Sequence, residues 1–375
     1  MPADDADPLL EEMRESVRSG GAKRSRLSVW MAGHAAEIAA MIAAYGADWD
    51  RWGALFVRRG LLAAPAVAAR AQSGPWPARQ SIRLVATFPP GGLADTIGRL
   101  VAPALGAALG QSVVIDNRAG AGGTIGADMV AKSPPDGYTL VVSHASPHGF
   151  APGIYPQLPY DPVADFTHLG MLVDTPSALL VTAKSPHRAL ESLLDAARKG
   201  SVRYGSSGVG SSGHLLGEVL AKDARAPRLD HVPYRGSAPG LQDLMSGAIE
   251  SLIDPLTTNM GMLKDGTLRA LAVTTARRMP ALPDVPSFEE LGYPRLTAGV
   301  WIGLSGPRGL PAPIAERITA EIPKVLARPD LRQRFDELAS YPPEQPLLGA
   351  EYARYIADFA KLWTAVAREA NITAS

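Results

Sequence analysis

Short strand-type segments alternate with helix-type segments along most of this chain, and this alternation is the feature that most constrains its fold. Runs rich in Val, Ile and Leu occupy residues 81–88, 112–117 and 138–144, and helical periodicity fills the intervals that follow the first two. A second series of the same kind starts at residues 178–185. The pattern predicts an α/β fold, with mostly parallel sheets and helices on both faces.

The two series predict two lobes. Residues 178–298 form one complete series of strands and helices, whereas the run at 301–307 is expected to return to the first series. We therefore expect one lobe to comprise residues 79–177 and 299–375, and the other to comprise residues 178–298.

The composition excludes several classes of protein. The 375 residues include no cysteine, which excludes disulfides, thiolate catalysis and a lipid-modified cysteine anchor. Lys and Arg number 37, as do Asp and Glu, so no excess of positive charge points to a nucleic-acid partner.

The N-terminal region carries a signal-like segment in an unusual place. Residues 27–49 have the spacing of an amphipathic helix rather than of a membrane span. Residues 55–71 have the order of an export signal: Arg58 and Arg59, an apolar stretch, and a small-x-small site ending at Ala71. We expect Sec- or Tat-dependent export to the periplasm, with the true start downstream of Met1 and residues 1–54 as an extension. An ordinary Ala-rich helix is the alternative.

Gly- and Ser-rich loops follow most of the expected strands. Their sequences are FPPGGLAD, NRAGAGGTIG, SHASPHG, SSGVGSSGH and PYRGSAPG, and most of them open a helix. In open α/β sheets ligands bind beyond the carboxyl ends of the strands, and helix N-termini favour anions there. The loops thus predict a cleft for a carboxylate or a phosphate.

Two catalytic or cofactor motifs compete with this interpretation. Gly208–Gly213 spells G-x-G-x-x-G, but Asp230 precedes the next strand instead of ending it, so the dinucleotide fingerprint lacks its acidic partner. His144 and His148 have metal-ligand spacing but no evident third ligand. We expect no enzyme, no cofactor and no metal; a nucleotide-dependent enzyme and a ligand sensor with the same fold are the alternatives.

Several ordered motifs resemble those of one known family. They include IRLVATFPPGGLADTIGRLVAPAL, LGQSVVIDNRAGAGGTIGADMVAKSPPDGYTL, SSGVGSSGHLLGE and HVPYRGSAPGLQDLMSG. From about Ile82 to the C-terminus the chain resembles the substrate-binding proteins of tripartite tricarboxylate transporters, the Bug family. The resemblance implies a monomeric, two-lobed Venus-flytrap protein. It would bind a small carboxylate, namely a di- or tricarboxylate, an amino acid or an aromatic acid, for membrane permease subunits.

The resemblance also implies which residues bind the ligand. Transferred by position, the ligand-binding set is Phe88, Pro89, Pro90, Gly91, Gly92, Asp95, Ser143, His148, Ser206, Ser207, Gly208, Gly210, Ser211 and Asp254. Three residues depart from the family pattern: Pro90 replaces a frequent Ala, Leu93 a small residue, and Ala151 a common Asn. The bulkier, drier first loop predicts a ligand more apolar than citrate.

Overall fold

The computed structural model describes residues 75–373, which belong to one compact unit. The signal-like segment at 55–71 and the helix expected at 27–49 lie outside the described residues. Within residues 75–373, no helix is both long and apolar enough to cross a membrane.

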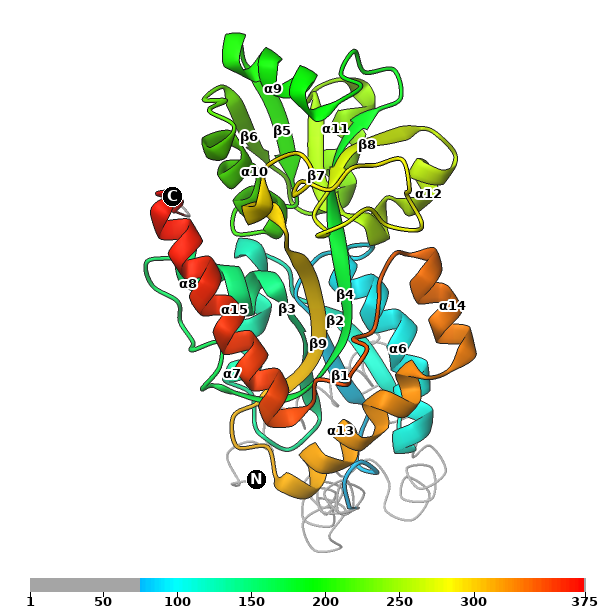
Figure 1. Cartoon of the computed structure of the whole chain (residues 1–375). Helices are drawn as coiled ribbons and strands as arrows, with labels where there is room; N and C mark the ends of the chain where they lie inside the picture. Colours follow the sequence, from blue (N-terminus) through cyan, green and yellow to red (C-terminus); the bar gives the residue numbers. More distant parts are fainter. Residues whose placement is uncertain (1–74, 374–375) are drawn as a thin grey trace, which may run out of the picture. The chain divides into compact units, whose positions relative to one another are not determined.

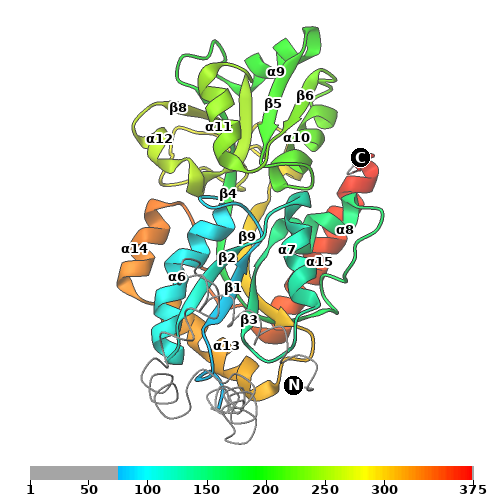
Figure 2. The same ribbon diagram turned by 180° about the vertical axis from the view of Figure 1, so that it is seen from behind.

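Three parallel strands form the first sheet with one antiparallel neighbour. β1 (Ile82–Ala86) lies between β2 (Val113–Asn117) and β3 (Thr139–His144), and β9 (Gly299–Pro307) pairs antiparallel with β3. Because β2 and β3 flank β1 on opposite sides, right-handed crossovers place the connecting helices on opposite faces of the sheet. These helices are α6 (Leu93–Leu109) and α7 (Thr124–Ala131), on either side of the strands (Figures 1 and 2).

The second sheet repeats this plan. β5 (Val202–Ser206) pairs in parallel with β6 (Leu229–Pro233) and with β7 (Ser251–Pro255). Its helices and outer strand are α9 (Leu190–Lys199), α10 (Ser212–Asp223), α11 (Ser237–Ser246), the 3₁₀ turn η5 (Leu256–Thr258), α12 (Met260–Lys264) and β8 (Leu268–Val273).

A single long strand joins the two sheets. β4 (Phe166–Thr182) pairs antiparallel with β9 over its first part and with β7 and β8 over its last part (Figure 1). The strand expected at 178–185 therefore begins twelve residues earlier than predicted. The α/β class is as predicted, but the sheet is mixed, because every pairing of β4 and β9 is antiparallel.

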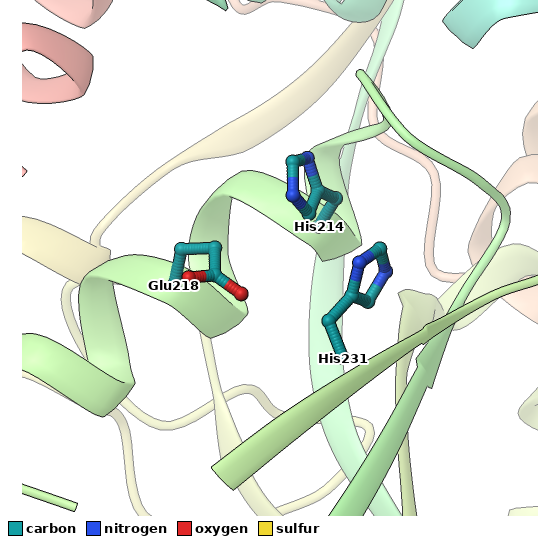
Figure 3. Close-up of side chains that lie close together, drawn as sticks. All are labelled: His214, Glu218 and His231. Atoms are coloured by element: carbon teal, nitrogen blue, oxygen red, sulfur yellow. The ribbon is translucent and has the colours of Figure 1, made fainter. Parts of the chain in front are cut away.

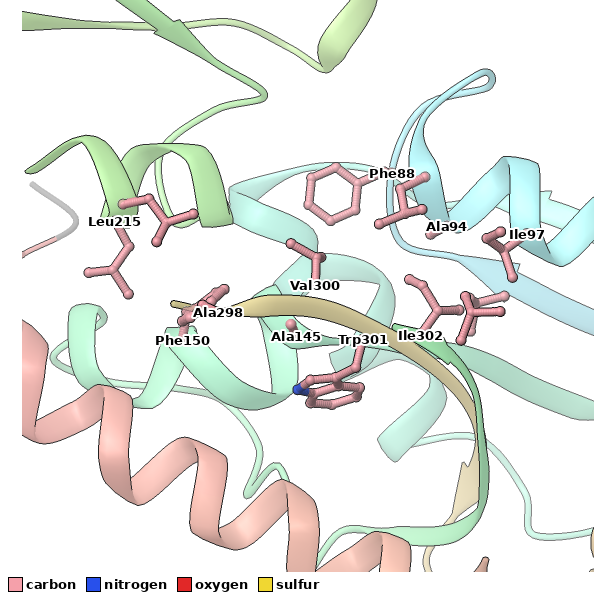
Figure 4. Packing of buried hydrophobic residues seen from close by; sticks show 14 of the residues in the cluster. Phe88, Ala94, Ile97, Ala145, Phe150, Leu215, Ala298, Val300, Trp301 and Ile302 are labelled. Atoms are coloured by element: carbon pink, nitrogen blue, oxygen red, sulfur yellow. The ribbon is translucent and has the colours of Figure 1, made fainter. Parts of the chain in front are cut away.

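The C-terminal helices cover the first sheet. Trp301 is fully buried on β9 and meets Tyr352 of α15 (Gly349–Glu369) edge-on, with ring centroids 5.7 Å apart. Phe150 contacts Trp363 of the same helix at 4.9 Å, and Leu215 of α10 lies in the same hydrophobic cluster (Figure 4). The other elements here are η3 (Ala121–Gly123), the π-helical turn η4 (Ser146–Phe150), α8 (Ala151–Ile154), α13 (Ala312–Leu326) and α14 (Pro329–Glu337). The short η6 (Pro294–Leu296) contacts α10.

Candidate functional site

The loops that follow strands of both sheets line one hollow. They follow β1 in the first sheet and β5 and β6 in the second, and the last residues of β3 and β7, His144 and Pro255, complete the lining. The lining residues are Phe88, Pro89, Pro90, Gly92, Leu93, His144, Ser207, Ser212, Arg235, Gly236, Ser237, Ala238, Pro239 and Pro255. The hollow lies beyond the carboxyl ends of these strands, where ligands bind in open α/β sheets.

The loop between β1 and α6 is held rigidly by one buried carboxylate. Asp95 accepts hydrogen bonds from the Gly91 N–H at 2.9 Å, the Arg99 Nε at 2.9 Å and the Asn117 amide at 2.9 Å. Burial alone raises the pKa of Asp95, but the hydrogen bonds from Arg99, Gly91 and Asn117 hold it below its ordinary value. Gly91 has φ +80°, a conformation that suits glycine. Asp95 therefore holds the backbone of the loop at Gly91 in place.

The N-terminus of α6 lies at the hollow, and no side chain caps it. The N-cap residue is Gly92, which has no side chain to accept a hydrogen bond from the first turn. The N-terminal N–H groups and the helix dipole favour an anion there.

The loop between β6 and α11 has the same design with different chemistry. Its N-cap is Gly236, with φ +109° and again no side-chain cap. Ser237, the first residue of α11, donates its hydroxyl to Asp254 at 2.8 Å, and Thr258 and Asn259 donate to the same carboxylate. Asp254 is fully buried, and burial raises its pKa. This buried carboxylate, which does not line the hollow, thus orients the start of α11.

The electrostatic balance of the hollow favours a negatively charged ligand. Arg235 is exposed and is the one charged side chain among the lining residues. His144 also lines the hollow, but burial lowers its pKa to about 3, so the imidazole is neutral at pH 7. One arginine, two uncapped helix N-termini and no lining carboxylate make an anion-binding surface.

A second hollow of about 500 Å³ continues from the first. The two share Phe88, Pro89, Ser207, Arg235 and Gly236, and the second extends to the 119–123 and 208–209 loops. These two loops touch: a Cβ on Gly122 would lie 2.9 Å from the carbonyl oxygen of Val209. The loops of the two sheets therefore meet beside these two hollows.

Six of the fourteen predicted ligand-binding residues line these hollows. Phe88, Pro89, Pro90, Gly92 and Ser207 line the first hollow, and Gly208 lines the second. Gly91, Asp95 and Asp254 support the loops as described above. Ser211 caps α10 by accepting the His214 N–H, and Gly210 packs against Tyr155.

Three other predicted residues lie away from both hollows. The Ser143 hydroxyl is 2.9 Å from the Tyr352 hydroxyl, and the Ser206 hydroxyl is 2.7 Å from Nε2 of His231. His148 is fully buried beside Phe166, with ring centroids 4.7 Å apart. Desolvation, strengthened by the neighbouring histidines, holds the pKa of His148 well below its ordinary value. These side chains contribute to the core in this structure.

The predicted ligand-binding set lacks four polar side chains that line the first hollow: His144, Ser212, Arg235 and Ser237. A signal for two of them was present. The loop PYRGSAPG, which contains Arg235 and Ser237, was recognised as a strand-end loop, and such loops are where ligands bind in α/β sheets.

In the G-x-G-x-x-G segment the first two glycine N–H groups already have hydrogen-bond partners. The Gly208 N–H donates to the Ser206 hydroxyl at 3.2 Å, and the Gly210 N–H donates to Nδ1 of His214 at 3.3 Å. A dinucleotide fingerprint needs the backbone to approach the pyrophosphate freely. The geometry thus disfavours the dinucleotide alternative.

Comparison with known proteins identifies the family of this chain. Residues 97–372 match the tripartite tricarboxylate transporter family receptor. The chain belongs to this receptor family. The finding confirms the family resemblance, the binding-protein fold and the role in solute capture that the sequence predicted.

Individual relatives cover most of the chain. It is 34% identical to protein BugT of Bordetella pertussis over 82% of this chain and 94% of BugT. Among solved structures, one is a Rhodopseudomonas palustris protein with adipate, at 34% identity and a TM-score of 0.74, covering 80% of this chain and 99% of that one. Another is MatC of the same organism with bound malate, at 30% identity and a TM-score of 0.72, covering 77% and 99%.

Proposed function

We propose that this receptor captures a small dicarboxylate in the hollow between α6 and α11 and delivers it to a membrane permease without chemical change. The observation that carries the proposal is the pair of uncapped helix N-termini, at Gly92 and Gly236, facing one hollow whose single lining charge is Arg235. We further propose that the receptor acts as a monomer in the periplasm.

The loop before α6 and the loop before α11 form the two walls of the hollow. Their chemistry suits the two charged ends and the apolar middle of a dicarboxylate. One carboxylate is held by the N–H groups at the start of α6, and the other pairs with Arg235 at the start of α11. Phe88, Pro90 and Leu93 offer apolar surface between them. This favours a linear dicarboxylate with methylene groups, such as adipate, over citrate, in which a third carboxylate and a hydroxyl need further polar partners.

The lobes predicted from the sequence give a means of closure. In this proposal residues 178–298 move against residues 79–177 and 299–375, with the β4 and β9 segments between the sheets acting as the hinge. The contact between Gly122 and Val209 places loops of the two proposed lobes against each other, as expected of a closed receptor.

The lining side chains support capture rather than catalysis. Three serines face the hollow, and the Ser237 hydroxyl donates to Asp254 rather than to a histidine base. His144 is bonded through Nδ1 to the Ser146 N–H at 2.9 Å. A serine nucleophile needs an adjacent base that a third group orients.

Calorimetric titration of the purified chain with adipate, malate, citrate and a monocarboxylate tests the proposal. We expect adipate to bind most tightly. Arg235→Gln should weaken adipate binding about 10- to 100-fold, because it removes a charge-assisted hydrogen bond worth roughly 1.5–3 kcal/mol. Arg228→Gln, on the exposed segment before β6, is the matched control and should bind as the native chain does. Equal binding by Arg235→Gln and native protein would contradict the proposal, as would a preference for citrate.

Export is tested separately by N-terminal sequencing of the protein from the periplasmic fraction. Gln72 as the first residue supports cleavage after Ala71. Met1 as the first residue refutes it.

A further inference from the structure

A group of three metal-ligand side chains lies on the second sheet, apart from the residues that line the ligand hollow. His214 and Glu218 project from α10, and His231 projects from β6 (Figure 3). One ligand atom from each lies within 4.8 Å of the others. We propose that His214, Glu218 and His231 bind a divalent transition-metal ion, with Zn²⁺ as the best-fitting metal.

The topology explains why these three residues meet. α10 is the crossover helix between β5 and β6, so it packs on the face of the sheet that these strands present to it. Residues four apart on a helix lie on one face, which aligns His214 with Glu218. Tyr204 of β5 is the register partner of His231 on β6, and the two rings stack at 5.0 Å on the face that α10 covers.

Hydrogen bonds determine which imidazole nitrogens face the gap between the side chains. Nε2 of His231 is occupied by the Ser206 hydroxyl at 2.7 Å, and Nδ1 of His214 accepts the Gly210 N–H at 3.3 Å. The nitrogens left for a metal are Nδ1 of His231 and Nε2 of His214. Glu218 completes the set with a carboxylate oxygen.

Two of the three candidate ligands, Glu218 and His231, also have a partner that orients them. The Tyr204 hydroxyl donates to Oε1 of Glu218 at 2.8 Å, and the Ser206 hydroxyl contacts the far nitrogen of His231. Such outer contacts are typical of metal sites, where they fix ring orientation. Two nitrogens and one carboxylate oxygen suit Zn²⁺ and disfavour Ca²⁺ and Mg²⁺, which prefer oxygen ligands only. A fourth position would remain for water.

Binding requires a small local rearrangement. The imidazoles of His214 and His231 now stack at 4.4 Å with their planes 28° apart. Tetrahedral zinc with bonds near 2.1 Å places its ligand atoms roughly 3.4 Å apart, so ligand atoms that now lie up to 4.8 Å apart must close in by about 1.4 Å and the rings must turn. Coordination through Nε2 also moves the His214 proton to Nδ1, which breaks the hydrogen bond from Gly210. That shift gives the site a measurable signature.

Titration of the untagged, chelator-treated chain with ZnCl₂ in a calorimeter tests the site. We expect one Zn²⁺ per chain. Glu218→Gln keeps an acceptor for Tyr204 but removes the negative charge, and it should weaken binding about 10- to 100-fold or more. His231→Ala should abolish it. His187→Ala, on the loop before α9, is the matched control and should bind as the native chain does.

Two measurements protect the test against misfolding and against confusion with the dicarboxylate site. In the native chain, histidine NMR should show the His214 proton moving from Nε2 to Nδ1 when Zn²⁺ is added. Arg235→Gln should lose dicarboxylate affinity and keep full Zn²⁺ affinity. No stoichiometric binding to the native chain would overturn the proposal, as would undiminished binding by Glu218→Gln and His231→Ala or an unchanged His214 tautomer.

Discussion

The two loops that open α6 and α11 face each other across one hollow and share a backbone design, yet their chemistry differs. Each places an uncapped Gly at the start of a helix, and each is supported from behind by a buried Asp. The α6 loop carries Phe88, two prolines and Leu93, whereas the α11 loop carries an exposed Arg235 and a serine.

The two loops therefore contribute different groups to the hollow. The α6 loop is locked by a low-pKa carboxylate and surrounded by apolar groups, so it supplies shape and an uncharged anion site. The α11 loop supplies the positive charge. A ligand that must satisfy both walls needs an anionic group at each end.

Among substitutions in the two loops, Gly236→Ala should lower dicarboxylate affinity the most. Gly236 has φ +109°, where an L-residue is strained by roughly 1–3 kcal/mol. A Cβ there would also lie 3.0 Å from Cγ of Pro89 on the opposite loop. We expect dicarboxylate affinity to fall by about 100-fold in a calorimetric titration, because the two walls can no longer approach.

Gly247→Ala is the matched control at the other end of α11. Gly247 also has positive φ, but nothing lies within 4 Å of its would-be Cβ. This variant should lose stability to heat while keeping its affinity. If both variants lost affinity equally, strain in α11 rather than contact between the walls would explain the result.

A smaller effect is expected from Asp95→Asn. The substitution removes the charge that pairs with Arg99 and weakens the support of the Gly91 N–H, which should cost about 1–2 kcal/mol in free energy of unfolding. Arg99 is half exposed, which limits the Coulombic part. Affinity should fall about tenfold as the α6 loop loosens.

Asp116→Asn serves as the control for Asp95→Asn in urea unfolding and ligand titration. Asp116 pairs with Arg118 at 3.0 Å nearer the surface and does not line the hollow. Its loss should leave affinity unchanged. Native affinity in the Asp95→Asn chain would show that ligand binding does not depend on the Asp95 carboxylate.

The smallest effect concerns selectivity. Leu93 is buried against the hollow, and Leu93→Ser should shift the adipate-to-malate affinity ratio several-fold toward malate, since about 1 kcal/mol of apolar contact is lost. Ile125→Ser, on the exposed face of α7, is the control and should leave the ratio unchanged. A ratio that Leu93→Ser does not move would show that the apolar wall does not select the ligand.

The sequence predicted the α/β elements well because their patterns are local. The strands at 82–86, 113–117 and 139–144 fall inside their expected ranges. β4 was harder: Gly170, Asp174 and Pro176 interrupt its apolar run, so its first half did not read as a strand. The antiparallel direction of β9 depends on pairing with distant strands, which local periodicity cannot report.

The site was predicted at the level of loops rather than side chains. Strand-end loops converge by topology, so the loop containing Phe88 and the loop containing Ser207 were found. Whether a side chain in such a loop faces the ligand or the core depends on tertiary packing. Ser206 and His148 turn inward, and the adjacent Ser207 faces the hollow.

The crystal structure of the complex with the tightest-binding dicarboxylate would test the two-walled hollow most directly. We predict one carboxylate within hydrogen-bond distance of the N–H groups in the first turn of α6, and the other paired with the Arg235 guanidinium. A ligand that contacts neither α6 nor Arg235, or that binds both carboxylates on one wall, would contradict the account.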